Sequence, residues 1–68
     1  MARVSVEVLP GRRRLVVELE EPTVAELLRR LGLGRESAVV ARDGRPLLED
    51  AELRDGDHVV VFIAASGG

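Results

Sequence analysis

Val59-Val60-Val61-Phe62-Ile63 is an unbroken apolar run near the end of the sequence. A short apolar run without polar alternation is typical of a strand in the middle of a sheet, where its neighbours bury it. The run is far shorter than the roughly 20 apolar residues that a membrane-spanning helix needs. We therefore expect residues 59–63 to form a central strand, against which the rest of the chain is arranged.

The beginning of the chain supplies two alternating runs that can pair with each other. A period of two places every second side chain on the same face of a strand. The Pro10-Gly11 pair between the runs favours a turn, so we expect an antiparallel hairpin with Arg12, Arg13 and Arg14 at its tip. Because no aromatic residue flanks these arginines, a solvated turn is favoured over a phosphate-binding patch. The apolar positions of the two runs are Val4, Val6 and Val8, then Leu15, Val17 and Leu19.

A helix is expected after the hairpin. Thr23 can accept a hydrogen bond from a free backbone N–H, and Glu26 three residues later completes the pattern of a capping box. Gly32 suits a left-handed C-terminal cap, because it has no Cβ to clash. These signals predict a helix of about two to three turns. Its apolar stripe, at the spacing i, i+3, i+4 and i+7 that packs on a sheet, consists of Val24, Leu27, Leu28 and Leu31.

The second half of the chain contains two shorter strand signals and a loop. Residues 38–42 are typical of a short strand, and Asp43-Gly44 is a strong turn signal before residues 45–48. Pro46 lacks a backbone donor, so we expect residues 45–48 to form an edge strand. Residues 49–57 are acidic and rich in turn formers, and we expect Leu53 to anchor them in the core while the others are exposed.

This order of elements predicts a single α+β domain, a mixed sheet with one main helix packed across it. Placing the first and last strands side by side in the middle of the sheet buries the most valine surface. It also lets the chain leave the sheet after the last strand. We therefore assign residues 1–63 to the domain and residues 64–68 to a flexible C-terminal tail ending in Gly67-Gly68.

The composition limits the function classes. The formal net charge of −2, with both signs interspersed, gives no field that favours nucleic acid. With no Cys and one His, neither a metal site nor a catalytic constellation can be assembled, so we do not expect an enzyme. Since no signal-peptide or membrane-spanning pattern is present, we expect a cytoplasmic chain with protein partners. All ten basic residues are Arg, which a GC-rich genome explains better than heat adaptation, because heat adaptation more often enriches Lys.

The segment from Asp55-Gly56-Asp57 to Phe62, taken with the terminal Gly67-Gly68, resembles the ThiS/MoaD family of ubiquitin-like sulfur carriers and the archaeal small modifier proteins. The helix start at residues 23–28 and the turn at residues 41–44 are also similar to that family. The resemblance implies the β-grasp, or ubiquitin-like, fold. MoaD-like proteins often carry Phe-Pro-Pro before the diglycine, whereas here residues 63–66 contain no proline, as in ThiS or in carriers that serve tRNA thiolation.

The resemblance also implies a chemistry for the tail. An activating enzyme would use MgATP to adenylate the Gly68 carboxylate, and the chain itself would bind no cofactor. Sulfur donor and acceptor enzymes would then make and use a thiocarboxylate for thiamine, molybdopterin or tRNA thiolation, or lysines of target proteins would attack the adenylate. The narrow neighbours Gly67 and Ser66 would let the tail enter an enclosed site, with a reach of roughly 17 Å.

An alternative function is a β-grasp protein- or RNA-binding module with an incidental tail. Phe62, the one aromatic residue, and Val60 share a strand face, so they form either a partner-docking patch near the tail or part of the core. For the acidic residues 49–57 a solvated turn is favoured over a surface that steers a basic partner. His58 has no companion ligand for a metal and is expected to be an ordinary strand-start residue.

Overall fold

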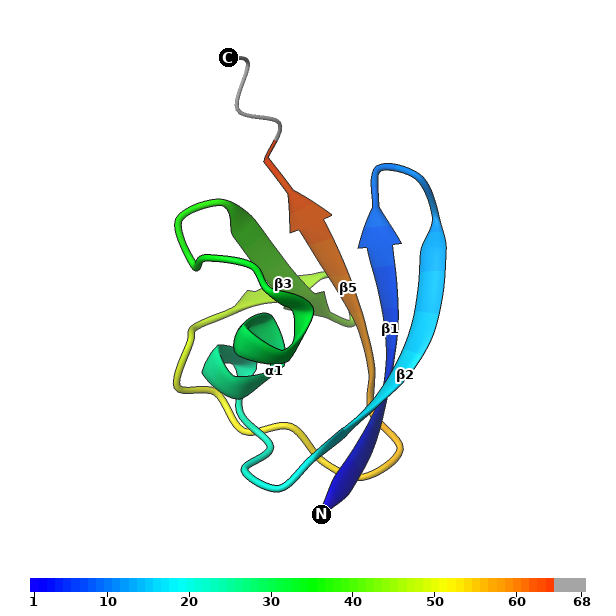
Figure 1. Cartoon of the computed structure of the whole chain (residues 1–68), viewed down its shortest axis with the longest axis vertical. Coiled ribbons are helices and arrows are strands. Elements are labelled where there is room, and N and C mark those ends of the chain that lie inside the picture. Colours follow the sequence, from blue (N-terminus) through cyan, green and yellow to red (C-terminus); the bar gives the residue numbers. More distant parts are fainter. Residues whose placement is uncertain (65–68) are drawn as a thin grey trace.

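The structure, a computed structural model, describes residues 1–64 of the chain. Within them, five strands and one helix follow one another (Figure 1). The sheet order is β2-β1-β5-β3-β4, with β1 parallel to β5 and the other neighbours antiparallel. The last strand therefore lies in the centre beside the first, as the apolar run predicts. The elements are β1 (Ala2–Leu9), β2 (Arg13–Leu19), α1 (Val24–Leu31), β3 (Ala38–Arg42), β4 (Arg45–Leu47) and β5 (His58–Ile63).

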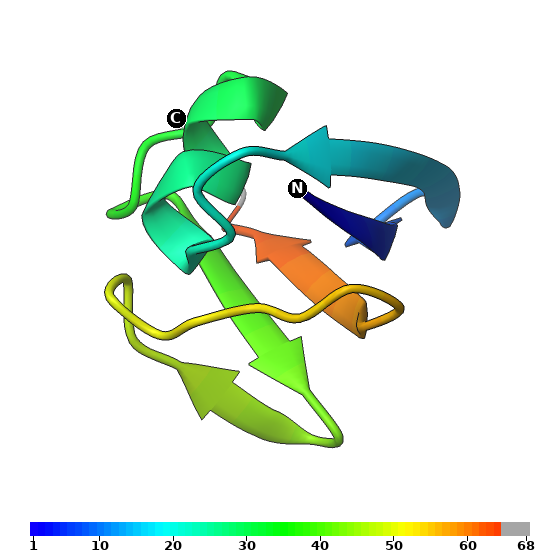
Figure 2. The same ribbon diagram turned by 90° about the horizontal axis from the view of Figure 1, so that it is seen from below.

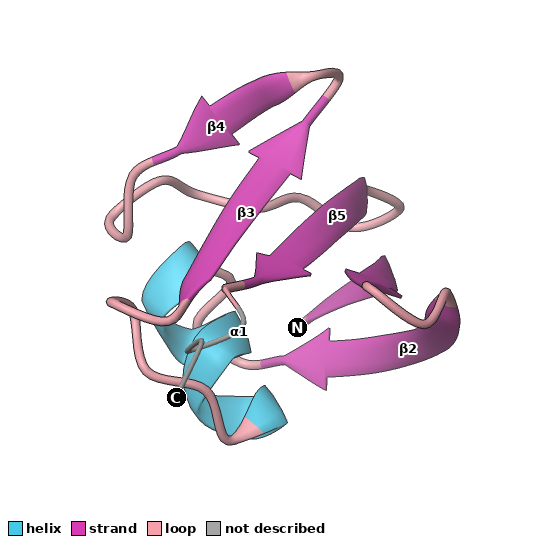
Figure 3. Cartoon of the chain, turned by 90° about the horizontal axis from the view of Figure 1, so that it is seen from above, coloured by secondary structure: helices cyan, strands magenta, loops and turns pink. Residues whose placement is uncertain are grey.

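The helix α1 covers one face of the sheet, and the core lies between them (Figures 2 and 3). Val24, Leu27 and Leu28 of the predicted stripe are buried, and Leu31 is half-buried at its end. The strands β1 and β2 send alternate side chains into the core, which confirms their predicted period of two. The buried strand residues are Ala2, Val4, Val6, Val8, Val17, Leu19, Ala38, Val40, Val59 and Val61.

The start of the helix is capped, but only one of the two hydrogen bonds of the expected capping box forms. The Thr23 Oγ1 accepts a hydrogen bond from the Glu26 N–H at 3.2 Å, as predicted. The Thr23 N–H donates to the Glu21 carbonyl at 2.8 Å, so the reciprocal bond to the Glu26 side chain does not form. The Glu26 carboxylate instead lies 3.7 Å from the Arg29 guanidinium one turn further along the helix. At the other end, Gly32 has φ 73° and forms the predicted left-handed cap.

The loop before β5 holds the start of the helix. Leu53 is buried, as predicted, and its N–H donates to the Pro22 carbonyl at 2.6 Å. The Val24 N–H and the Ala25 N–H, which have no acceptor inside the helix, donate to carbonyls of this loop at 3.1 and 2.9 Å. The loop therefore supplies hydrogen-bond acceptors for the first turn of α1. This role could not be predicted from the sequence.

Three local predictions need correction. The hairpin turn occupies residues 10–12 and β2 begins at Arg13, so only Arg12 of the arginine cluster lies in the turn. Arg14 instead faces Glu7 across the strands, where opposite charges attract. The strand β4 is one residue shorter than expected, and Leu48 beyond it is exposed. Asp57 is half-buried rather than exposed, because it pairs with an arginine described below.

Candidate docking face and the end of the last strand

Alternation in β5 separates the residues that hold the fold from those that face outward. Val59 and Val61 are fully buried under the helix. Val60 is half-buried and Phe62 is 46% exposed, and both lie on the opposite face of the sheet. Phe62 is therefore not a core residue, and the one aromatic side chain of the chain remains accessible close to the end of β5.

Two neighbouring strands extend this apolar surface. Phe62 lies opposite Val39 of β3 on one side and Leu9 of β1 on the other. Val39 is 50% exposed, and Leu9 is half-buried. We call the set Leu9, Val39, Val60 and Phe62 the outer patch. Leu9 and Val39 were not predicted from the sequence, although the position of Val39 between two buried residues, Ala38 and Val40, is a signal that it faces outward.

A hollow of about 450 Å³ adjoins the outer patch. Phe62, Val60 and Ala41 supply its apolar wall, and the residues of the two turns at 42–44 and 56–58 supply the polar wall. A surface with an apolar patch beside a partly polar hollow suits a protein side chain better than a large ligand. His58, the first residue of β5, is exposed at the border of this hollow.

An ion pair fixes the turn that leads into β5. The Arg42 guanidinium donates to the Asp57 carboxylate at 2.7 Å and to the Glu52 carbonyl at 3.2 Å. The Asp57 carboxylate also accepts the Arg54 N–H at 2.9 Å. The backbone hydrogen bond from Arg54, helped by the charge and hydrogen bond of Arg42, holds the pKa of Asp57 below its usual value. This network ties the loop to β3 and sets the position at which β5 begins.

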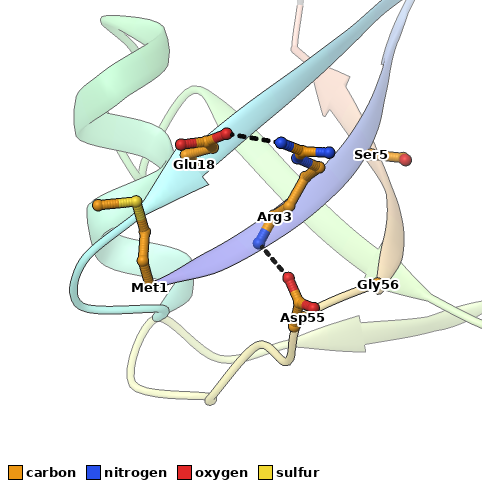
Figure 4. A pocket seen from close by; sticks show the side chains of 6 residues that line it. All are labelled: Met1, Arg3, Ser5, Glu18, Asp55 and Gly56. Atoms are coloured by element: carbon orange, nitrogen blue, oxygen red, sulfur yellow. Dashed lines mark hydrogen bonds and ion pairs between the residues drawn. The ribbon is translucent and has the colours of Figure 1, made fainter.

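A second hollow, of about 420 Å³, lies at the other end of the molecule, near the N-terminus (Figure 4). The Arg3 guanidinium lies 3.0 Å from the Glu18 carboxylate, and the Arg3 N–H donates to the Asp55 carboxylate at 2.8 Å. The Arg3 carbonyl accepts the Gly56 N–H at 2.8 Å. Because these charged groups bind one another, we assign them to holding the loop against β1 rather than to ligand binding.

The three predicted tail residues of the site, Ser66, Gly67 and Gly68, lie outside the described residues. The last described residue, Ala64, donates its N–H to the Ser37 carbonyl at 2.9 Å. The C-terminal end of β5 points away from the N-terminal end of the molecule (Figure 1). Over residues 1–64, no group of His, Cys, Asp or Glu side chains could hold a metal ion. The helix of this same part of the chain is not long and apolar enough to cross a membrane.

The central pairing of β1 with β5 and the single helix across the sheet define a ubiquitin-like β-grasp protein. The sequence model of small archaeal modifier protein 2 matches residues 2–62, and the chain belongs to this family. Solved structures agree on the fold. The ubiquitin of Caldiarchaeum subterraneum matches with a TM-score of 0.71 at 19% identity, with 98% of each chain covered. The ubiquitin-like domain of Plasmodium falciparum Dsk2 matches with a TM-score of 0.74 at 19% identity, covering 93% of this chain and 97% of that one.

A computationally designed protein based on human erythrocytic ubiquitin is also similar, with a TM-score of 0.71, 26% identity, and 100% and 98% of the two chains covered. The family match confirms the predicted resemblance to the archaeal small modifiers and the β-grasp fold. The chain is thus a small ubiquitin-like modifier protein, which is not itself a catalytic enzyme. Modifiers of this kind generally act with activating enzymes and target proteins.

Proposed function

We propose that this chain is a carrier whose Gly68 carboxylate is activated by a partner enzyme, either for sulfur transfer or for conjugation to lysines of other proteins. The observation that carries the proposal is the family match over residues 2–62 in a chain whose sequence continues to Gly67-Gly68. The fold supports it, because β5 ends at Ile63 on the side of the molecule away from the N-terminus.

The carboxylate needs activation before it can react. An ionised carboxylate is a poor acyl electrophile, since its charge opposes attack and its oxygen is a poor leaving group. In the proposed step, a Gly68 carboxylate oxygen attacks the α-phosphorus of MgATP and pyrophosphate leaves. The product is an acyl adenylate, from which AMP departs readily. ATP and magnesium are bound by the activating enzyme, and this chain supplies only the carboxylate.

Two nucleophiles can then displace AMP. A donor persulfide gives an acyl disulfide, and attack by a second thiolate on that disulfide releases the thiocarboxylate and leaves a disulfide between the two thiols. The thiocarboxylate supplies sulfur to an acceptor enzyme. Alternatively, a lysine amine of a target protein attacks the adenylate, or a thioester made from it, and forms an isopeptide bond. Both fates use the same carboxyl carbon.

The outer patch is the proposed docking surface for the activating enzyme. Phe62 and Val39 are about half exposed and stand side by side on adjacent strands. Accessible aromatic and branched side chains of this kind are typical anchors of protein interfaces. Because Phe62 lies two residues before Ala64, a partner bound to the patch would have the tail within reach of its nucleotide site.

The proposal is tested by ATP–pyrophosphate exchange with the purified activating enzyme from the same organism. One variant carries an additional alanine after Gly68, and the matched control carries an additional alanine before Met1. We expect the C-terminal extension to abolish exchange and the N-terminal extension to leave it unchanged, because only the first removes the free Gly68 carboxylate. A binding module with an incidental tail would support no exchange even as the unextended chain. No exchange with the unextended chain, or undiminished exchange with the C-terminally extended chain, would therefore contradict the proposal.

A further inference from the structure

The two edges of the sheet differ in how open they are. The strand β4 has three residues and Pro46 in its middle, and a short strand with proline is a common device against edge pairing. The strand β2 has seven residues, Arg13–Leu19, without proline or glycine, and its outer side has no partner among the described residues. Figure 3 shows the two strands at opposite borders of the sheet. An open edge of this length is a template for another strand.

The hydrogen bonds of β1 reveal which groups of β2 face this open edge. The Ser5 N–H and the Arg3 carbonyl bond to the turn before β5, on the side away from β2. The N–H and C=O of one strand residue point to the same side, so Ser5 and Arg3 do not bond to their partners in β2, Val16 and Glu18. Val16 and Glu18 therefore turn their own backbone groups to the open edge, as does Arg14 by the same alternation.

We propose that β2 pairs with β2 of a second copy of this chain, antiparallel about Val16, to form a two-fold symmetric dimer. In this register Val16 meets Val16 of the second copy. Arg14 meets Glu18 of the second copy, and Glu18 meets Arg14 of the second copy. The three edge-facing residues of each copy would then contribute about six backbone hydrogen bonds across the interface.

In this arrangement the outward charges of β2 are complementary to those of the second copy. The outward side chains of the strand read Arg14, Val16 and Glu18, with Val16 59% exposed. An antiparallel pairing about Val16 sets opposite charges directly across from each other, which stabilises a sheet. A parallel pairing sets Arg14 beside Arg14, and an antiparallel shift can set Glu18 against Glu18, and both are repulsive. The Arg3–Glu18 ion pair within each copy (Figure 4) adds a positive charge to the same cluster.

The helix side of the edge also offers apolar surface to a second copy. Leu15 and Leu31 are half-buried there and border a hollow of about 680 Å³. In the proposed register, Leu15 faces Val17 of the second copy, so the inward side chains of the two strands would cover this surface together. The two β5 strands would run antiparallel in the joined sheet. Both outer patches and the C-terminal ends of both β5 strands would therefore remain free for the proposed function.

The test is sedimentation equilibrium of the purified chain at concentrations up to about 1 mM. We expect the apparent mass to rise from that of the 7.4 kDa monomer to twice that value. Arg14→Glu and Glu18→Arg should each weaken association by about tenfold or more, because each sets like charges against one another. A mixture of these two variants should associate again, because every facing pair is then of opposite charge.

Arg45→Glu, on the opposite edge strand β4, is the matched control and should leave association unchanged. Thermal unfolding checks that each variant is folded. If a charge reversal unfolds the chain, Val16→Lys replaces it, since this side chain is exposed and would meet its own copy across the two-fold axis. The proposal is overturned by a chain that stays monomeric at every concentration, by a dimer that the β2 variants do not weaken, or by variants that fail to associate when mixed.

Discussion

The two faces of the sheet are made from alternate residues of the same strands, yet the helix covers only one of them. In β5, Val59 and Val61 are fully buried by the helix, whereas Phe62, the next residue, is 46% exposed. In β3, Val40 is buried and Val39 is 50% exposed. The covered face holds the fold, and the open face keeps apolar side chains that the fold does not need. We therefore expect replacements on the covered face to lower stability and replacements on the open face to affect partner binding instead.

The largest expected effect is on the covered face. Leu27→Ala removes a fully buried side chain from the centre of the helix stripe and should lower the free energy of unfolding by about 2–5 kcal/mol. This is a large part of the stability of a small domain. Urea denaturation measures it, with Val39→Ala on the open face as the matched control. Equal losses in the two variants would contradict the assignment of stability to the covered face.

Phe62→Ala should separate partner binding from stability. Because the ring is about half exposed, we expect the free energy of unfolding to fall by no more than about 1 kcal/mol. The kcat/KM of the activating enzyme for this chain should fall about tenfold, as for an anchor residue at an interface. Arg30→Ala, which alters an exposed side chain of the helix on the other face of the sheet, is the control. An unchanged kcat/KM for Phe62→Ala would refute the docking role of the patch.

Thr23→Ala should destabilise the helix α1, which covers one face of the sheet. Losing the cap hydrogen bond to the Glu26 N–H is expected to cost about 1 kcal/mol. For a domain of this size that corresponds to a decrease in Tm of about 4–8 °C. Thr23→Ser keeps the acceptor oxygen and should stay close to the original Tm. If the alanine and serine variants melt together, the cap does not stabilise the helix.

The smallest predicted effect is a dependence on pH. The pKa of Asp57 is lowered in the folded state, so its contribution to stability is present above its unfolded pKa, about 3.9, and is lost as the pH falls through the folded value. The contribution is small because the Arg42–Asp57 pair is partly solvated. Asp57→Asn should therefore reduce stability slightly at neutral pH and flatten its decrease in acid. Urea denaturation of both proteins between pH 7 and pH 2 measures this difference. If the free energy of unfolding falls equally in the two proteins as the pH is lowered, Asp57 does not have this role.

The sequence predicted the elements that depend on local signals. The valine alternation, the Thr23 N-cap, the Gly32 C-cap and the apolar run at residues 59–63 each occur where their patterns place them. The order of the elements was sufficient to place β1 beside β5, because that arrangement buries the two most apolar strands in the centre of the sheet.

Features that depend on competing local contacts or on contacts between distant residues could not be predicted. The Glu26 half of the capping box fails because the Glu21 carbonyl is the acceptor for the Thr23 N–H. Asp57 is half-buried because Arg42, from another strand, pairs with it. Phe62 and Val60 were identified as candidates, but Leu9 and Val39 join them only through the strand register. The role of Gly68 rests on the family and on the sequence, and it stays a proposal.

We propose that the carboxyl carbon of Gly68 is the reacting centre. Mass spectrometry of the protein isolated from its native cells tests it most directly. We predict that part of the protein carries sulfur in place of a C-terminal oxygen, or that target lysines are modified. After digestion with trypsin, a modified lysine would carry residues 55–68, because Arg54 is the final cleavage site in the sequence of this lysine-free chain. Only unmodified carboxylate and no attached lysines, in cells with active sulfur metabolism, would contradict the claim.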